Sequence, residues 1–232
     1  ESGENNLEWY TAMFPLCDRL NIGWSFWSYK KMNCKNSPVT FVRPEGWSLL
    51  MQHIHDGTVL SQSQAQDIFD EFLDCISKPM YQDAVVCALT RTPPFVLPCE
   101  AFDESRIQSQ RIPGVELRMR EQASLLFRDG HTDEPDYRRL KGEPQPEEEN
   151  IVVRLKTGDG IGFHVNIANA PAVGRLLAYG EGEIEISCNG TVMEDVHKEF
   201  GVYYFKIHQI GKLTLNIRCL KGEIDADRIV FE

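Results

Sequence analysis

The 232-residue sequence predicts an α/β segment followed by an all-β sandwich. All four tryptophans and the strongest helical patterns lie before residue 90, whereas apolar residues alternate with polar ones at every second position later in the chain. Between the two parts lies TPPFVLP, residues 92–98, whose three prolines exclude a regular helix. We therefore expect two domains, residues 1–92 and residues 93–232.

The first domain shows helices alternating with one apolar strand. Residues 5–20 predict a helix, because Asn5 and Glu8 suit a capping box and apolar side chains recur on one face. The run IGWSFWSY, residues 22–29, has strand length and fits a strand buried on both faces of a parallel sheet. A helix followed at once by such a strand is typical of an α/β unit. Two more helices are expected, over residues 46–55 and from Ser61 onward with Gln64 as the capping-box partner.

The second domain carries short strands of alternating polarity. Four clear runs have their apolar residues on one face: residues 151–156, 161–167, 183–188 and 213–219. Asn189-Gly190 favours a tight turn between strands. Such short, regular strands predict an antiparallel β-sandwich of jelly-roll type. The acidic run EPQPEEE, residues 143–149, is expected to be an exposed loop.

Charge and composition exclude several classes of function. The formal net charge is −11, which disfavours nucleic acids and anionic membranes as partners and suits a neutral substrate. No apolar run approaches the roughly 18 residues that a membrane helix needs. The seven cysteines include no C-x-x-C pair, which argues against a structural zinc site. No signal-peptide pattern follows Glu1, so we expect a fragment or a processed product.

The stretch ESGENNLEWY, followed by NIGWSFWSYKKM, resembles glycoside hydrolase family 5, the cellulase and mannanase barrels. In that family a Gly-Glu-x-Gly motif carries the nucleophile after strand seven, and strand eight ends in a Trp-x-x-Trp run near a lysine. Glu1-Ser2-Gly3 matches the motif without its leading glycine. The segment NSPVTFVRPEGW is similar to loops after strand eight in some members. The resemblance implies that residues 1–92 are the terminal portion of a (β/α)8 barrel, with the rest of the barrel upstream.

This resemblance assigns roles to five residues. Glu1 would be the nucleophile of a retaining β-glycosidase, while the acid/base carboxylate would lie upstream, so the fragment alone is expected to be inactive. Trp27 would stack on a sugar ring, and Trp24 would face the barrel wall. Lys30 or Lys31 would hydrogen-bond a sugar hydroxyl. The alternatives are core tryptophans, lysines in a solvated turn, and a first-turn helix acid at Glu1.

The last 140 residues resemble carbohydrate-binding modules of the family 6 and 35 type. Those sandwiches open with a Glu-x-aromatic strand and close with an Asp-x-Ile-x-Phe strand, matched by Glu100-Ala101-Phe102 and by residues 227–231. The resemblance implies that Glu100 and Asp227 hold a structural calcium; two surface acids on edge strands are the alternative. Gly160 stands where the family commonly has a tryptophan, so sugar recognition would depend on tyrosines, or the sandwich would be a structural appendage.

The leading functional prediction is the C-terminal part of a retaining β-glycosidase, of endo-β-glucanase or mannanase type, that hydrolyses a plant β-linked polysaccharide. Catalysis would need no cofactor. By the same resemblance, the parent protein would be extracellular or at the cell surface. The alternative is a non-catalytic polysaccharide-binding or structural accessory protein.

Overall fold

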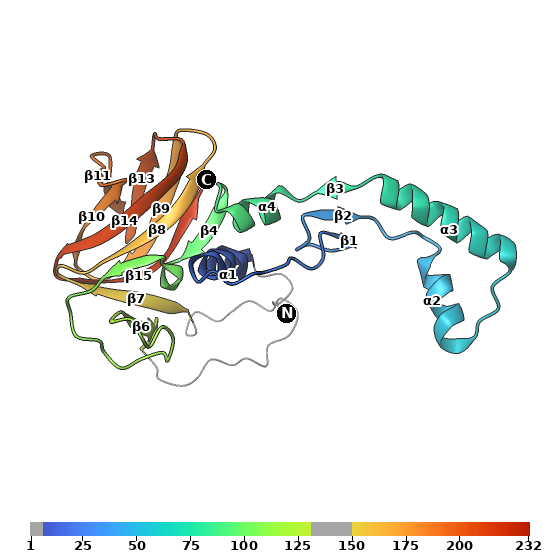
Figure 1. Ribbon diagram of the computed structural model, residues 1–232, viewed down its shortest axis with the longest axis horizontal. Coiled ribbons are helices and arrows are strands. Elements are labelled where there is room, and N and C mark those ends of the chain that lie inside the picture. The colour runs from blue at the N-terminus through green and yellow to red at the C-terminus, as the bar shows by residue number, and fades with distance from the viewer. Residues whose placement is uncertain (1–6, 131–149) are drawn as a thin grey trace. The chain divides into compact units, whose positions relative to one another are not determined.

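The computed structural model describes residues 7–130 and 150–232 (Figure 1). The chain divides into two compact units, and each is described by itself. The larger unit joins Glu1–Trp24 with Val86–Glu232, and the smaller unit is Ser25–Val85. The predicted acidic loop at residues 143–149 lies outside the described residues. Within the described part of the chain, no helix is long and apolar enough to cross a membrane.

Two antiparallel sheets form the larger unit. The first sheet has the spatial order β11-β10-β14-β8-β5, and the second has the order β12-β13-β9-β15-β7-β6, with β4 also pairing with β15. The first sheet consists of β5 (Glu104–Arg106), β8 (Gly160–Ile167), β10 (Glu183–Cys188), β11 (Thr191–Val192) and β14 (Gly211–Lys221). The second consists of β4 (Phe95–Pro98), β6 (Ser124–Phe127), β7 (Ile151–Lys156), β9 (Ala172–Tyr179), β12 (His197–Glu199), β13 (Val202–Ile207) and β15 (Glu223–Phe231). The predicted β-sandwich is confirmed.

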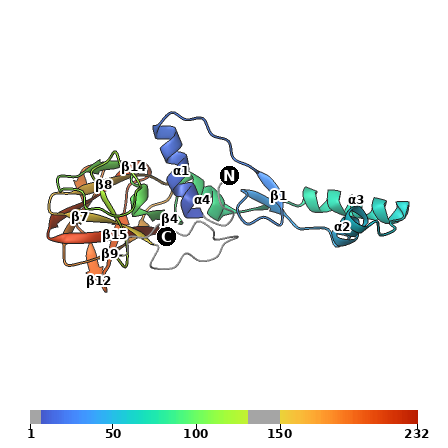
Figure 2. The same ribbon diagram turned by 90° about the horizontal axis from the view of Figure 1, so that it is seen from below.

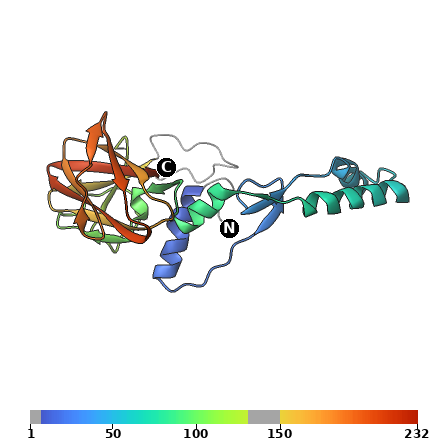
Figure 3. The same ribbon diagram turned by 90° about the horizontal axis from the view of Figure 1, so that it is seen from above.

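The core of the sandwich follows from the alternation along its strands. Every second side chain of β9, β13 and β14 is buried, and its neighbours are more exposed; β8 alternates in the same way except that Gly162 is also buried. Phe95 and Phe231 stack with ring centroids 4.8 Å apart. Gly174 faces Phe205, whose ring would lie 2.2 Å from an added Cβ atom, so only glycine fits there. Figure 3 shows the strands of this unit from above.

Two helices belong largely to the sandwich unit. Helix α1 (Leu7–Arg19) contacts β4, beside which it lies in Figure 2, and Thr11 Oγ1 donates to the carbonyl of Val96. Helix α4 (Asp83–Thr90) leads into Arg91. A 3-10 turn, η1 (Cys99–Ala101), follows β4. The predicted helix over residues 5–20 is therefore confirmed for the residues that the structure describes.

The buried side chain of Arg91 connects these pieces. Its Nε donates to the carbonyl of Thr11 in α1 at 2.7 Å, and its Nη2 donates to the carbonyl of Ala101 at 3.2 Å. Its Nη1 forms an ion pair with Asp103 and donates to the carbonyl of His164 at 3.2 Å. This network explains why α1 joins the sandwich, whereas the sequence predicted one boundary near residue 92.

The smaller unit contains a three-stranded sheet and two helices. Strand β1 (Lys30–Met32) runs parallel to β2 (Val39–Phe41), and β2 runs antiparallel to β3 (Met80–Tyr81). Helices α2 (Trp47–Asp56) and α3 (Gln62–Ser77) lie between β2 and β3 in sequence. Ser61 and Gln64 form the predicted capping box of α3. Phe72 packs against Phe41 and Trp47, with ring centroids 5.9 and 6.0 Å away.

The predicted buried strand over residues 22–29 is wrong. These residues form no strand, and Ile22 and Trp27 are 53% and 90% exposed. The apolar run has no neighbouring strands to pair with, and regular pairing begins only at Lys30. A (β/α)8-barrel portion is not seen among the described residues, where the three-residue pair of β1 and β2 is the one parallel pairing.

Replacing Arg91 tests the proposed connection. We expect Arg91→Ala to lower the free energy of unfolding by about 3–5 kcal/mol, because the buried Asp103 would keep only the more distant Arg19 as a cation, with Arg19 Nη1 3.9 Å from Asp103 Oδ1. Urea denaturation measures this change. Arg120→Ala is the control, because Arg120 is exposed and such surface changes cost within about 0.5 kcal/mol. Equal effects of the two substitutions would show that Arg91 does not hold the unit together.

Candidate functional site

A polar hollow lies on the outer face of the five-stranded sheet. Its floor is β8, where Gly160 and Gly162 face outward and Ile161 and Phe163 face the core. In register, Gly160 lies between Arg218 of β14 and Arg106 of β5. Two residues earlier on β14 and on β5, Asn216 and Glu104 flank Gly162 in the same way. At Gly160 the missing side chain leaves space between β14 and β5, whereas Gly162 is buried beneath Asn216.

The hollow has a volume of about 240 Å³ and a polar lining. Strand β10 closes one side with Glu185 and Ser187, which are in register with Arg218 and Asn216. The lining thus offers two carboxylates, two guanidinium groups, an amide and hydroxyls, which together can both donate to and accept from a ligand's hydroxyls. The volume lies below the ~300–1,000 Å³ of pockets for drug-sized molecules and fits a small ring. No aromatic side chain lines it among the described residues.

Close packing requires glycine at the floor of the hollow. A Cβ atom on Gly162 would lie 2.6 Å from Oδ1 of Asn216. On Gly160 it would lie 3.1 Å from the carbonyl oxygen of Ile217. A larger residue at 162 would therefore displace the Asn216 amide from its position.

Two aspartates hold the short strand β5 at the edge of the hollow. Before the strand, the Asp103 carboxylate pairs with Arg91 and accepts from the backbone N–H of His164 at 2.7 Å. After the strand, Asp159 accepts from Gln108 N at 2.7 Å and from Ser109 Oγ at 2.6 Å. Burial raises the pKa of Asp159, but its hydrogen bonds lower that pKa more, so the net shift is downward.

Beside the hollow, the imidazole of His164 contacts both acids next to it. Its Nε2 lies 3.2 Å from Oε1 of Glu104, and its Nδ1 lies 3.7 Å from Oδ2 of Asp103. Glu104 therefore has a partner within the protein. The other lining carboxylate, Glu185, makes no ion pair or side-chain hydrogen bond with the described residues.

The two predicted calcium ligands are both shielded from solvent. Asp227 is 3% exposed, and its carboxylate accepts from Tyr179 Oη at 3.3 Å and from Arg228 Nε at 3.0 Å. Glu100 is only partly shielded as a residue, but its Oε2 is buried and has no hydrogen-bond partner in the described part of the chain. The pKa of Glu100 is raised to about 8. Burial is the largest cause, and the nearby Asp227 and Glu8 also raise this pKa, while a backbone hydrogen bond and Arg228 lower it.

The calcium prediction fits these two residues in part. Glu100 and Asp227 interact electrostatically, and neither is a surface acid on an edge strand, because Glu100 lies in η1 and Asp227 in β15. An orphaned, buried carboxylate oxygen is a suitable ligand for a hard cation. Among the described residues, however, no group of three or more His, Cys, Asp or Glu that could hold a metal is found. Calcium binding stays a prediction.

Trp24 and Trp27 occupy different surroundings. Trp24 lies in the larger unit, where its ring packs on Phe14 at 4.3 Å and its Nε1 donates to Asp18 Oδ1 at 2.8 Å. Trp27 lies in the smaller unit and is 90% exposed. Its predicted role in sugar stacking stays a prediction, as does the role of Trp24.

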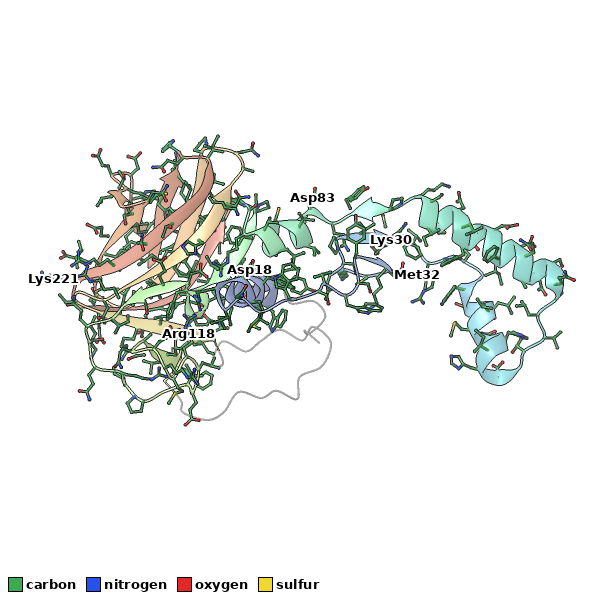
Figure 4. The ribbon with its side chains drawn as sticks, in the orientation of Figure 1. Asp18, Lys30, Met32, Asp83, Arg118 and Lys221 are labelled. Carbon is green, nitrogen blue, oxygen red and sulfur yellow. The ribbon has the colours of Figure 1, made fainter. Side chains whose placement is uncertain are left out.

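The predicted lysines lie on β1 of the smaller unit. Lys30, labelled in Figure 4, donates through Nζ to the carbonyl of Ile76 at 2.6 Å and lies 5.7 Å from the ring centroid of Phe41. Lys31 is exposed. Glu1, the predicted nucleophile, lies outside the described residues, so the roles of all three residues stay predictions.

Sequence analysis missed the hollow. Its signal was present in GIGFHVNI, where two glycines occupy successive outward positions of one strand. We had interpreted Gly160 only as the loss of a tryptophan. The partners of these glycines are distant in sequence, and only the strand register brings them together.

Comparisons with known proteins give structural likenesses only. No protein-family profile and no curated protein matches the sequence. A family 6 carbohydrate-binding module from Clostridium stercorarium, solved with cellobiose, is 11% identical, with 62% of this chain and 96% of that chain covered and a TM-score of 0.40. A β-1,3-glucan-binding family 6 module from Bacillus halodurans is 14% identical, with coverages of 61% and 97% and a TM-score of 0.39.

A third solved structure, the carbohydrate-binding module CBM36 in complex with calcium and xylotriose, is 12% identical. The match covers 60% of this chain and 99% of the chain of that module, with a TM-score of 0.33. TM-scores of this size support no argument about function. The sandwich fold of this chain therefore rests on its own strand order.

The raised pKa of Glu100 predicts a pH-dependent stability. Ionising this group costs more in the folded state, so the penalty is absent below its ordinary pKa of 4.5 and grows as pH rises toward about 8, by roughly 1.4 kcal/mol per pH unit. In EDTA we expect the wild-type chain to lose stability between pH 5 and pH 8, as measured by urea unfolding. Glu100→Gln should show a flatter profile. Parallel profiles for the two proteins would contradict this assignment.

Proposed function

We propose that this chain acts as a non-catalytic polysaccharide-binding module and binds a β-linked glycan in the hollow on the five-stranded sheet. The observation that carries the proposal is the pair of outward glycines, Gly160 and Gly162, framed by polar side chains. A sugar ring presents hydroxyls around its rim, and each needs a donor or an acceptor when it leaves water. The lining supplies both kinds of group, from β10 and β14 on one side of β8 and from β5 on the other.

The placement of these groups on strands also supports binding. Asn216, Arg218 and Glu185 lie on paired strands within the sandwich, so the backbone ladder fixes their spacing. Because their positions are fixed before a ligand arrives, binding would cost little ordering of the backbone. The absence of an aromatic platform among the lining residues predicts modest affinity that depends on hydrogen bonds.

Asn216 is the residue that tests this proposal. We expect Asn216→Ala to weaken glycan binding by roughly 3- to 10-fold, because one neutral hydrogen-bonding group contributes about 0.5–1.5 kcal/mol. Affinity electrophoresis in polysaccharide gels and calorimetry with cellobiose or xylotriose measure the loss. Gln122→Ala removes an exposed amide outside the hollow and should leave binding unchanged. Equal binding by both variants would locate the site elsewhere.

We also propose a structural calcium at Glu100 and Asp227. When bound, the ion would coordinate the buried Oε2 of Glu100, which has no hydrogen-bond partner among the described residues. These two carboxylates would hold it, and its effect would be on stability rather than on catalysis.

Calcium should therefore raise the melting temperature of the wild-type chain, measured after dialysis against EDTA. Glu100→Gln and Asp227→Asn should each remove the shift, because each takes away one carboxylate ligand. Magnesium at the same concentration is the control, since it loses its water shell reluctantly. A calcium shift that persists unchanged in both variants would rule out this site.

A catalytic parent protein is the second candidate, and the resemblance of segments within residues 1–47 to family 5 glycosidases favours it. In that case residues 1–92 would belong to a (β/α)8 barrel, with Glu1 as the nucleophile. Trp27 and one of Lys30 and Lys31 would contact the substrate, and Trp24 would face the barrel wall beside them. The acid/base carboxylate would come from a preceding segment. Release of reducing sugar from β-glucan or β-mannan by this chain alone would contradict the expected inactivity.

A further inference from the structure

We infer that the hollow selects a sugar unit that carries a carboxylate, a uronate, through Arg106 and Arg218. This inference rests on the proposed function, because it names the ligand class of the same hollow. The two arginines are in register with Gly160 from opposite sides, on β5 and β14. Both are exposed, and both line the hollow.

Neither arginine makes an ion pair or a side-chain hydrogen bond with any of the residues described. Three other arginines of the sandwich unit are paired, although the exposed Arg120 makes no such contact with the described residues either. Arg154 pairs with Asp225 at 2.7 Å, Arg175 with Glu232 at 2.5 Å, and Arg228 with Glu8 at 3.3 Å. The two guanidinium groups at the hollow thus keep their donors free for a ligand.

The acidic groups nearby do not neutralise this pair. Glu104, next to Arg106 on the outer face of β5, lies 3.2 Å from His164 instead. Glu185 is in register with Arg218 on the side away from Gly160, yet no ion pair within 4 Å forms between them. A carboxylate above Gly160 would therefore meet two guanidinium groups, while hydroxyls of the same sugar could donate to Glu185.

Guanidinium groups recognise carboxylates by shape as well as by charge. The planar fork of arginine donates two parallel hydrogen bonds to the two oxygens of a carboxylate, which a neutral hydroxymethyl group cannot accept in the same way. Because residue 160 is glycine, no side chain from this position stands between Arg106 and Arg218. A uronate carboxylate could contact either arginine or both.

The net charge of −11 narrows the class of glycan further. A dense polyanion would be repelled by the protein as a whole, whereas screening at physiological salt limits that repulsion to about 8 Å. Direct contacts with Arg106 and Arg218 act within this distance. The favoured ligand is thus a largely neutral β-linked chain that carries uronates at intervals.

Chemically matched glycans test this selection. Glucuronoxylan and a β-linked arabinogalactan that carries glucuronate are each compared with their own carboxyl-reduced forms, in which every uronate becomes a neutral sugar. We expect the wild-type chain to bind at least one native glycan about tenfold or more tightly than its reduced form, because charge-assisted hydrogen bonds disappear on reduction. Added NaCl should weaken only the binding of native glycan.

The arginine variants assign that preference to the hollow. Arg106→Gln and Arg218→Gln should lower the affinity for native glycan more than the affinity for the reduced form, so that the ratio of the two affinities falls, and Arg218→Lys should recover only part of the preference. Arg120→Gln removes an exposed charge outside the hollow and should bind both forms as the wild type does. Melting temperatures check that each variant is folded.

The outcomes separate the two proposals. Equal binding of native and reduced glycan would overturn the uronate inference and leave polysaccharide binding intact. A preference that survives in both glutamine variants would also overturn it, because the carboxylate would then be recognised elsewhere. If none of the four glycans binds, both the proposed polysaccharide binding and the uronate inference are wrong.

Discussion

The buried pair of Arg91 and Asp103 is the interaction on which much of the larger unit depends. Arg91 gathers backbone carbonyls from α1, the η1 turn and β8, while Asp103 compensates its charge. Asp103 lies directly before β5, so the same pair that fixes α1 also fixes one edge of the hollow. Asp159 holds the other end of this three-residue strand through Gln108 and Ser109. A short edge strand is thereby held in place from both ends.

The two faces of β8 illustrate how one strand can serve stability and binding together. Ile161 and Phe163 fill the core, and the glycines that alternate with them, Gly160 and Gly162, add no side chain to the outer face. Because a single register positions both faces, the packing of the core sets the spacing of Arg106 and Arg218 on the surface. Glu100, in contrast, destabilises the fold when it is ionised, because its buried Oε2 has no hydrogen-bond partner among the described residues. Binding of a proton or a cation to this oxygen would remove that cost.

Much of the sandwich could be predicted from the sequence, and the reasons are local. Alternating side chains identify strands such as 161–167, and a capping box at Ser61 identifies the start of α3. The predicted strand over residues 22–29 failed because an apolar run of that length specifies burial only when neighbouring strands cover it. The connection of α1 to the sandwich depends on Arg91, whose partners lie up to 80 residues away. No periodic pattern carries that information.

The candidate site was the least predictable part, because it combines residues from four strands that the sequence separates. Amide chemical-shift mapping by NMR shows whether these residues bind glycan. On titration with an oligosaccharide carrying one uronate, we expect the largest shifts at Gly160, Gly162, Asn216 and Arg218. Shifts confined to the seven-stranded sheet, or to residues 25–85, would contradict this expectation.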